Sequence, residues 1–361
     1  FVDGTVIGVD TASMAVKDTI DLNQTIAASG LLGENLRARP ALAHPRSVAI
    51  TNNGDRVEED ETLWVTDFYA YQKVPLEPTG ANADVAKVGV VYRIPLASKE
   101  ASVVELPPMK DMGFRDVNDE VAGCFPNQLA SIHVQGAFGY VLSSCASPRG
   151  GQGAFAGPAF AACANDDQCP GAAPGSCNAG RCTTNCSADA ECGKNGGRCN
   201  ANVCAPNGAN IKTQVAPAVS IIDLGAAKTI ATVNLAREFE TYFDTLGLAD
   251  DASRRMPLTI TDIGFVPGTV TAYVASRGTD AVFRVDFNAS YEASNIDSLG
   301  DPKAPFIDLA PGGVDPSRTG RLPTGVAVAH KLHPKEAAAR YAFVANEATR
   351  NVSVLDLAAQ G

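Results

Sequence analysis

Several motifs that identify common enzymes are missing from the sequence. There is no G-x-S-x-G nucleophile elbow, no H-E-x-x-H zinc motif and no glycine-rich phosphate loop. No C-x-x-C-H haem-attachment motif occurs either. The only histidines are His44, His133, His330 and His333, none has an evident partner, and we expect most of them to be solvated or structural. The sequence therefore identifies no catalytic residues, which leaves enzymatic activity open and favours a binding role.

Long apolar segments and basic clusters are also missing. No stretch approaches eighteen consecutive apolar residues, so we expect no membrane-spanning helix. The formal charge is −11 and the 29 Lys and Arg residues form no dense block, so an acidic surface would repel phosphate and nucleic acid is not an expected partner. The opening FVDGTVIGVD looks like a strand and not a signal peptide, so we expect any targeting segment to be removed or to lie upstream.

Cysteine, in contrast, is abundant and concentrated. Eight of the ten cysteines lie between residues 163 and 204, in two repeats whose internal gaps are five, seven and four residues and then five, six and four. The repeats are Cys163, Cys169, Cys177 and Cys182, followed by Cys186, Cys192, Cys199 and Cys204. Most of these gaps are too long for a structural zinc site, and neither repeat has an apolar run that could form a core. We expect disulfides, with three possible connectivities in each repeat.

Disulfides persist outside the reducing cytosol. The cysteine content therefore predicts an extracellular, cell-surface or periplasmic protein.

The two cysteine repeats also carry acidic residues at matching positions, Asp166 and Asp167 in one and Asp189 and Glu191 in the other. Carboxylate and carbonyl oxygens bind calcium, which makes calcium a possible cofactor. Asp and Asn between close cysteines also shape turns by hydrogen bonding to the backbone. Both interpretations stay open, and the sequence suggests no other cofactor.

Outside the cysteine region, four strand-like phrases recur in a constant order. The first is SVAIT (47–51), LASIHV (129–134), DIGFV (262–266) and GVAVAH (325–330). The second, an aromatic residue followed by Val and then small polar residues, is LWVTDF (63–68), GYVLSS (139–144), AYVASR (272–277) and AFVANE (342–347). The third is TVIGVD (5–10), GVVYRIPL (89–96), VSIIDL (219–224), AVFRVDF (281–287) and VSVLDL (352–357). The fourth is DTIDL (18–22), SVVEL (102–106), TIATVNL (229–235) and PFIDL (305–309).

Four antiparallel strands per repeated unit predict an all-β fold, a β-propeller of four-stranded blades with a disulfide-rich insertion. The 33 glycines and 22 prolines agree with many short strands joined by turns. A β-sandwich with coincidental similarity is the alternative. We expect propeller blades over 1–145, the insertion over 146–216 in a loop of the third blade, and propeller blades again over 217–361.

The phrases WVTDF, YVASR and FVANE, each followed by a strand of V-x-V-x-D type, resemble the YVTN-repeat β-propeller family. The resemblance covers the predicted blades and leaves out the cysteine segment. It implies an exported propeller, typically of seven blades, and says little about function because the family includes both binders and enzymes.

The terminal strands do not match one another. The chain opens on a third strand, TVIGVD, and closes on another third strand, VSVLDL, so the two partial units cannot complete one blade. We therefore expect the chain to be a fragment of a longer polypeptide with further blades.

Polar residues at strand ends form the candidate binding site. In a propeller, the starts of first strands and the ends of second strands ring the same channel mouth. These positions are Arg46, Asn127, Asp262 and Thr324 at the starts, and Asp67, Ser144, Arg277 and Asn346 at the ends. Such a ring could bind a small ligand, a metal or a partner's loop, and it could equally satisfy backbone groups at the strand ends.

The longest loops are expected at the same channel mouth. The insertion and the connectors 107–126, 236–261 and 310–323 are all expected there. A hairpin around 135–138 would bring Cys145 close to Asn127, so we expect a Cys124–Cys145 disulfide, with pairing to the insertion as the alternative.

Two functions remain. The first is an exported interaction or scaffold protein that uses its insertion-bearing face, with the insertion held over the channel mouth, to bind a protein partner or neighbouring subunit. The alternative is the propeller subunit of an enzyme or electron-transfer protein, resembling lactonases, amine dehydrogenase heavy chains or haem-fused propellers, with the chemistry elsewhere in the chain.

Overall fold

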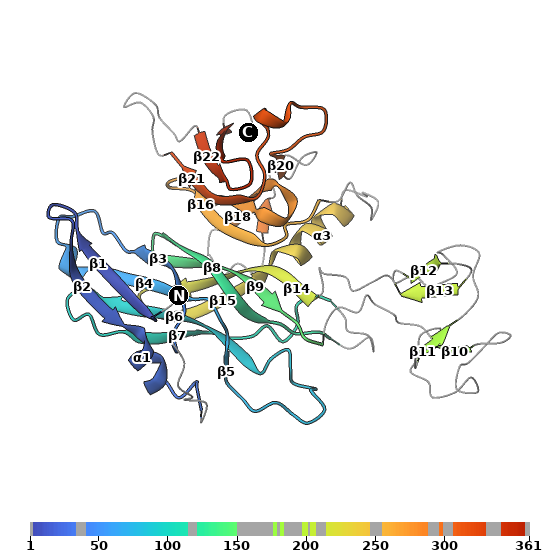
Figure 1. Ribbon diagram of the computed structural model, residues 1–361, viewed down its shortest axis with the longest axis horizontal. Helices are drawn as coiled ribbons and strands as arrows, with labels where there is room; N and C mark the ends of the chain where they lie inside the picture. The colour runs from blue at the N-terminus through green and yellow to red at the C-terminus, as the bar shows by residue number, and fades with distance from the viewer. Residues whose placement is uncertain are drawn as a thin grey trace.

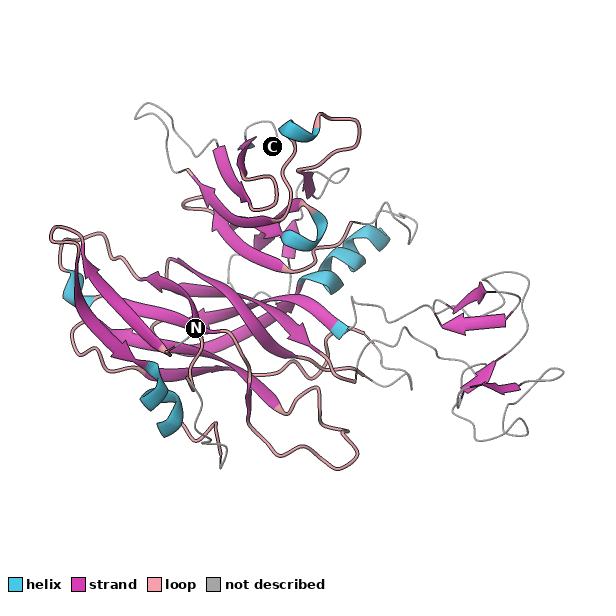
Figure 2. Ribbon diagram, in the orientation of Figure 1, coloured by secondary structure: helices cyan, strands magenta, loops and turns pink. Residues whose placement is uncertain are grey.

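The computed structural model describes residues 3–33, 41–114, 121–149, 176–178, 181–183, 197–200, 203–206, 214–245, 255–287, 296–298, 306–329 and 341–357. Strands dominate this part of the chain, with short helices at its margins (Figures 1 and 2). The predicted all-β class is confirmed.

Three units contain the four predicted strands in antiparallel order. The first comprises β3 (Pro45–Ile50), β4 (Thr62–Asp67), β6 (Lys87–Pro95) and β7 (Ser102–Leu106). The second comprises β8 (Phe125–Gln135), β9 (Phe138–Ala146), β14 (Val215–Asp223) and β15 (Lys228–Asn234). The third comprises β16 (Ile260–Phe265), β17 (Thr271–Ser276), β18 (Ala281–Phe287) and β20 (Phe306–Asp308). Short additional strands, β5 (Tyr71–Gln72) and β19 (Ile296–Ser298), pair with β6 and β18.

Partial units flank these three blades. Before them, β1 (Thr5–Asp10) pairs with β2 (Ala15–Asp21), the third and fourth strands of the repeat. After them, β21 (Pro323–Val328), β22 (Tyr341–Asn346) and β23 (Asn351–Asp356) are a first, second and third strand. The chain thus folds as the repeated phrases predict.

The strand register makes positions in different units directly comparable. The Val that follows the aromatic or apolar residue of the second strand is Val65, Val141, Val274 or Val344. Each pairs with an apolar residue of its own first strand, and these partners are Val48, Ile132, Ile263 and Val326. A constant register across four units identifies one structural repeat.

The units are arranged around a common axis. Their first strands are neighbours in succession, with β3 against β8, β8 against β16, and β16 against β21 (Figure 1). First strands at the centre and later strands toward the outside are the defining arrangement of a propeller. The protein is therefore a β-propeller arc of four-stranded antiparallel blades.

Apolar layers between successive blades form the core. Trp64 and Val91 of one blade pack against Ile132 and Val141 of the next. Two further layers repeat this contact: Tyr140 and Val219 share a cluster with Ile263 and Val274, and Tyr273 and Val282 share one with Val326 and Val344. Because side chains alternate between the two faces of a strand, each blade contributes to the layer on either side of it.

Two helices occur where the sequence phrases predicted none. Helix α3 (Leu235–Thr245) occupies the start of the predicted connector 236–261 and buries Phe239 and Phe243 against the second and third blades. Asn234 caps its first turn, since its Oδ1 accepts a hydrogen bond from Ala236 N at 3.1 Å. Helix α1 (Leu22–Ala28) follows β2 and is capped by Asp21. The i, i+4 spacing of Phe239 and Phe243 in the sequence is the signal that could have indicated this helix.

Candidate functional site

The end of the second strand carries a polar residue in all four units. The register aligns Asp67, Ser143, Ser276 and Asn346 at this position, and all four side chains are buried. Asp67 and Asn346 were predicted at strand ends and occupy this position, whereas the predicted Ser144 and Arg277 lie one residue further along. Counting from the shared Val would have selected the right serines.

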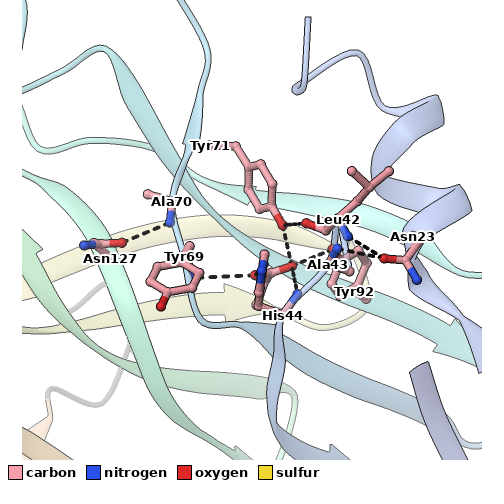
Figure 3. Close-up of polar contacts among 10 residues, drawn as sticks. Asn23, Leu42, Ala43, His44, Tyr69, Ala70, Tyr71, Tyr92 and Asn127 are labelled. Atoms are coloured by element: carbon pink, nitrogen blue, oxygen red, sulfur yellow. Dashed lines mark hydrogen bonds and ion pairs between the residues drawn. The ribbon is translucent and has the colours of Figure 1, made fainter. Parts of the chain in front are cut away.

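Asp67 is the most heavily hydrogen-bonded of these residues. Its Oδ2 accepts hydrogen bonds from the hydroxyls of Tyr71 and Tyr92, each at 2.7 Å, and from His44 N at 3.1 Å. Its Oδ1 accepts one from Tyr69 N at 3.3 Å. We call Asp67, Tyr71, Tyr92, His44 and Tyr69 the strand-end cluster (Figure 3). Every polar atom of the carboxylate therefore has a donor.

The cluster connects three successive units. Tyr71 also donates to Leu42 O at 2.9 Å, in the segment that leads into β3. The same segment is bound from α1, because Asn23 Oδ1 accepts hydrogen bonds from Leu42 N and Ala43 N (Figure 3). On the other side Asn127, at the start of β8, accepts a hydrogen bond from Ala70 N at 3.0 Å. The chain on either side of the strand-end cluster is thus bonded to the partial first unit through Asn23 and to the β8–β15 blade through Asn127.

Burial raises the pKa values of two groups in this cluster. The removal of Asp67 from water raises the pKa of its carboxyl, and the hydrogen bonds from Tyr92, His44 N and Tyr71 oppose that rise only in part. Burial, together with the neighbouring Asp67 charge, raises the pKa of the Tyr92 hydroxyl far above its usual range. Tyr92 therefore stays protonated and serves as a donor to Asp67.

His44 is the one member of the cluster with an unsatisfied buried nitrogen. Its Nδ1 has no hydrogen-bond partner among the described residues and lies 4.0 Å from Asp67 Oδ1. Its ring packs edge-on against Tyr69, with centroids 4.9 Å apart, and about a quarter of the side chain (24%) remains exposed. Of the two histidines in the described ranges, His44 lies beside Asp67 and His133 lies near Asp262.

The equivalent residues of later units bind backbone and neighbouring side chains. Ser276 Oγ exchanges hydrogen bonds with the N–H and C=O of Leu258, both at 2.8 Å, which anchors the segment before β16. Asn346 Nδ2 donates to Asn351 Oδ1 and Ser353 Oγ at the start of β23. In these two units, the residue at the end of the second strand therefore holds the segment before the first strand or the start of the third strand.

Two other residues predicted at strand ends, Asp262 and Arg277, connect neighbouring units. Asp262 Oδ2 accepts a hydrogen bond from Val326 N at 3.0 Å, across from β16 to β21. Arg277 Nη2 lies 2.9 Å from Glu347 Oε2 of the next unit. Thr324 Oγ1 donates to Ala345 O at 3.4 Å within its own unit. Arg46 is exposed on β3, and Ser144 pairs in register with Asn127.

A second titratable pair lies between the inner strands. Burial lowers the pKa of His133 on β8 and raises the pKa of Asp262 on β16, while the charge on each opposes the shift of the other. The His133 ring stacks on Phe265, with centroids 5.4 Å apart. Both groups are thus shifted toward their neutral forms in the contact between two blades.

The base of the cysteine insertion is fastened to the blades. The predicted disulfide is confirmed: Cys124 and Cys145 are bonded, with their Cα atoms 5.4 Å apart. Arg149, just after β9, donates its N–H to the buried Asp84 at 2.7 Å and its Nη1 to Ala81 O at 2.8 Å. Ser147 N donates to Gln214 O at 2.8 Å and so joins the outgoing and returning chain.

The described parts of the insertion are two hairpins. Strands β10 (Ser176–Asn178) and β11 (Arg181–Thr183) place Cys177 opposite Cys182. Strands β12 (Gly197–Asn200) and β13 (Val203–Pro206) place Cys199 opposite Cys204, so the tandem repeat is also a structural repeat.

Figure 1 draws both hairpins apart from the blades, beyond the end of β9 and the start of β14. This placement differs from the expectation that the insertion would cover the channel mouth.

The other predicted residues of the insertion, Cys163, Cys169, Cys186, Cys192 and the proposed calcium ligands Asp166, Asp167, Asp189 and Glu191, lie outside the described residues. Within the described ranges, no three histidine, cysteine or acidic side chains are grouped as a metal site requires. Neither described helix is long and apolar enough to cross a membrane.

Comparison with known proteins adds likenesses of overall shape. No protein-family model matches the chain, and no curated protein matches it by sequence. Among solved structures, hydrazine synthase of Kuenenia stuttgartiensis is 13% identical, with a TM-score of 0.31 over 98% of this chain and 89% of that one. The periplasmic gluconolactonase PpgL of Pseudomonas aeruginosa is 10% identical, with a TM-score of 0.23 over 98% of this chain and 87% of that one. Likenesses this distant assign no site or activity to this chain.

Proposed function

We propose that this protein is an exported scaffold of the YVTN-repeat type that binds a protein partner through the cysteine-rich insertion of its β8–β15 blade. The observation that carries the proposal is the fastened base of the insertion. A loop that only connected β9 to β14 would need no disulfide and no buried carboxylate at its stem. A loop that presents a binding surface gains from both, because a fixed base reduces the freedom lost on binding.

Three contacts hold the base from different directions. The Cys124–Cys145 disulfide joins the connector before β8 to the end of β9. Asp84, on the chain between β5 and β6, accepts a hydrogen bond from Arg149 N. Burial raises the pKa of Asp84, and Arg149 opposes this through its hydrogen bond and its charge. A buried carboxylate needs such partners, so Asp84 and Arg149 hold one another in place.

The insertion itself has the composition of a contact module. Its sequence between the cysteines is polar, includes Arg181, Lys194 and Arg198, and lacks large apolar anchors. Interfaces without such anchors bind through backbone and charge, with modest affinity. Figure 1 draws the two hairpins apart from the blades, which is the arrangement that a module for binding a partner requires. Export agrees with the disulfide, since disulfides persist in oxidising compartments.

The test is to replace residues 150–214 by a short turn and compare the deletion variant with the full chain. Both are immobilised and exposed to the secreted and surface protein fraction of the natural source, and any retained protein is identified and titrated. We expect the deletion to abolish binding of that protein and to leave the melting temperature of the blades unchanged. Equal retention by both proteins, or retention by neither, would contradict the proposal.

A matched variant tests whether the fixed base contributes to binding separately from the residues of the insertion. Cys124→Ala with Cys145→Ala keeps every residue of the insertion but frees its base, so we expect weaker binding and not its loss. If this double variant binds as tightly as the full chain, the fastened base has no part in recognition.

A second candidate is a hydrolytic or electron-transfer role, and His44 favours the hydrolytic form. An imidazole beside a buried carboxylate is a common general base, and the Nδ1 of His44 lies 4.0 Å from Asp67. Hydrolysis of a panel of lactones and esters by the full chain, lost in His44→Ala with an unchanged melting temperature, would support this candidate. Inactivity across the panel would count against it.

A further inference from the structure

A pocket lies between the outer strand of the β8–β15 blade and the connector that leaves the β3–β7 blade. It has a volume of about 230 Å³ and is lined by residues 107–109, which follow β7, and by residues 229–232 of β15. An apolar cavity of about 150 Å³ is large enough to bind benzene, so this pocket has room for an amino-acid side chain.

Hydrogen bonds join the two walls at both ends of the pocket. At one end Thr229 Oγ1 donates to Glu105 O at 2.8 Å, and at the other Asn234 Nδ2 donates to Met112 O at 2.7 Å. The connector and β15 therefore run side by side in the same direction. The connector spans more residues than β15 between these two hydrogen bonds, which leaves room for the pocket between them.

The middle of the connector wall is also held in place. Met109 exchanges both of its backbone hydrogen bonds with Cys124, at 2.8 and 2.9 Å. Cys124 is in turn bonded to Cys145 of the β8–β15 blade. Pro107 and Pro108 have φ angles that are fixed by their rings. Because the walls are already held, a ligand that enters the pocket loses little affinity to ordering them.

The chemistry of the lining limits what can bind there. All of the lining residues are uncharged, and most of them are apolar. The two threonine hydroxyls already have partners, since Thr229 bonds to Glu105 O and Thr232 lies 2.9 Å from Ser220 Oγ. Such a lining does not suit a phosphate, a sugar or a metal ion, because each of these needs charged or freely available polar side chains. An apolar side chain suits it.

The backbone of β15 offers hydrogen bonds beside the same pocket. β15 is the outermost strand of its sheet, and within the described ranges it pairs with β14 alone. The register shifts between Thr229 and Ala231, so Ile230 forms a bulge, and its side chain is 42% exposed. An open strand edge beside an apolar pocket is the arrangement that binds a peptide in extended conformation.

Exposed lysines stand at both ends of the pocket. Lys228 directly precedes the lining residues of β15, and Lys110 directly follows those of the connector. Because the two walls run in the same direction, these lysines lie at opposite ends. Of the acidic residues beside them, Glu105 is paired with Lys73 at 2.6 Å, and Asp111 accepts a hydrogen bond from a backbone N–H. The lysines therefore favour a ligand that carries acidic residues on either side of its apolar one.

We propose that this pocket binds an extended peptide segment of a partner protein. The peptide adds a strand to the edge of β15 and places an apolar side chain between Ile230 and residues 107–109, with its acidic residues toward Lys110 and Lys228. The strand edge provides affinity, and the pocket and the lysines provide specificity. The site is separate from the cysteine-rich insertion and does not depend on the function proposed for it.

A library of short random peptides displayed on phage, selected on the immobilised full chain, tests the proposal. Enriched peptides are synthesised and titrated by fluorescence anisotropy. We expect them to carry Leu, Ile or Val between acidic residues. We expect Ile230→Thr to bind them about tenfold more weakly, because it removes an apolar contact of the pocket. The double variant Lys110→Glu, Lys228→Glu should also bind them more weakly, with the greatest loss at low salt.

Two controls accompany these variants. Val16→Thr makes a similar change at an exposed apolar residue of β2, which is also a fourth strand but contributes nothing to the pocket lining. It should leave peptide binding unchanged, as should replacement of residues 150–214 by a short turn. Ile230→Thr and Val16→Thr should both keep the melting temperature of the full chain, because both positions are exposed.

Three outcomes would overturn the proposal. Failure of the library to yield any peptide that binds the chain would mean that the edge of β15 accepts no strand. Equal binding by the full chain and by Ile230→Thr would place the peptides elsewhere, and loss of binding on deletion of 150–214 would place them on the insertion. Enrichment of basic peptides would contradict the part given to the two lysines.

Discussion

The β3–β7 blade and the β8–β15 blade hold the same position, the end of the second strand, by different chemistry. In the first, the buried carboxylate of Asp67 accepts hydrogen bonds from two tyrosine hydroxyls and two backbone N–H groups. In the second, the equivalent Ser143 is buried, its hydroxyl has no partner among the described residues, and the Cys124–Cys145 disulfide secures the strand two residues further on. The end of the second strand is stabilised in both blades. A covalent bond takes the place of the polar network in the blade where the large insertion begins.

Loss of the Asp67 carboxylate should have the largest effect. Asp67→Ala leaves the Tyr92 hydroxyl and His44 N without this acceptor, and it leaves the Tyr71 hydroxyl with Leu42 O. Unsatisfied buried donors cost about 1–3 kcal/mol each and are not additive, so we expect a loss of roughly 3–5 kcal/mol of unfolding free energy. Denaturant unfolding followed by tyrosine fluorescence measures it. A loss below that of the disulfide variant would reverse the ranking of the two devices.

Removal of the disulfide should cost somewhat less. Cys124 and Cys145 are separated by 21 residues, and closing a loop of this length contributes about 3 kcal/mol. The double variant Cys124→Ala, Cys145→Ala should lose that amount in the same denaturant experiment. The wild-type chain under reducing conditions is an unsuitable control, because reduction would also open the disulfides that the sequence predicts in the insertion.

The two blades should also differ in their response to pH. Burial raises the pKa of Asp67 in the folded state above its unfolded value of about 4, so the folded protein binds the proton more tightly. Stability should therefore fall as pH rises from about 4 through the raised folded pKa. Asp67→Asn removes this contribution, while Ser143→Ala leaves it unchanged. A pH series of melting temperatures on the three proteins shows whether the difference between wild type and Asp67→Asn follows this course.

Ser143→Ala should have the smallest effect. Its buried hydroxyl makes no hydrogen bond among the described residues, so its removal deletes no interaction and avoids the cost of burying an unpaired group. We expect a change within about 0.5 kcal/mol of wild type, in either direction. A loss comparable to that of Asp67→Ala would show that this serine has a partner as important as those of Asp67.

Much of the fold was predictable because the repeat is local. The aromatic-Val strand, its paired first strand and the following strands each carry an alternating apolar pattern, and four copies in a constant order define one unit. The Cys124–Cys145 pairing was also predictable, since a hairpin brings the two cysteines together. Helix α3 was not predicted, although Phe239 and Phe243 are spaced for one helix face, because a connector was expected there.

The candidate site was predictable only in outline. Strand ends that carry polar residues could be named, and Asp67, Asn127, Asp262 and Asn346 do form ties at those ends. Tyr71 and Tyr92 were missed because they lie in a short extra strand and in a third strand, and no sequence pattern joins them to Asp67. Their meeting depends on how β5 and β6 curve around the end of β4.

The sequence by itself determined the order, pairing and register of the strands, because each of these follows from local alternation and short turns. The tertiary structure alone decided which equivalent positions are buried. Val48 and Ile132 belong to the same strand pattern, yet one is exposed and the other buried, because burial depends on the neighbouring blade and not on the residue. Asp67 likewise gains its four donors only in the folded blade, because Tyr69, Tyr71, Tyr92 and the backbone of His44 are separated along the chain.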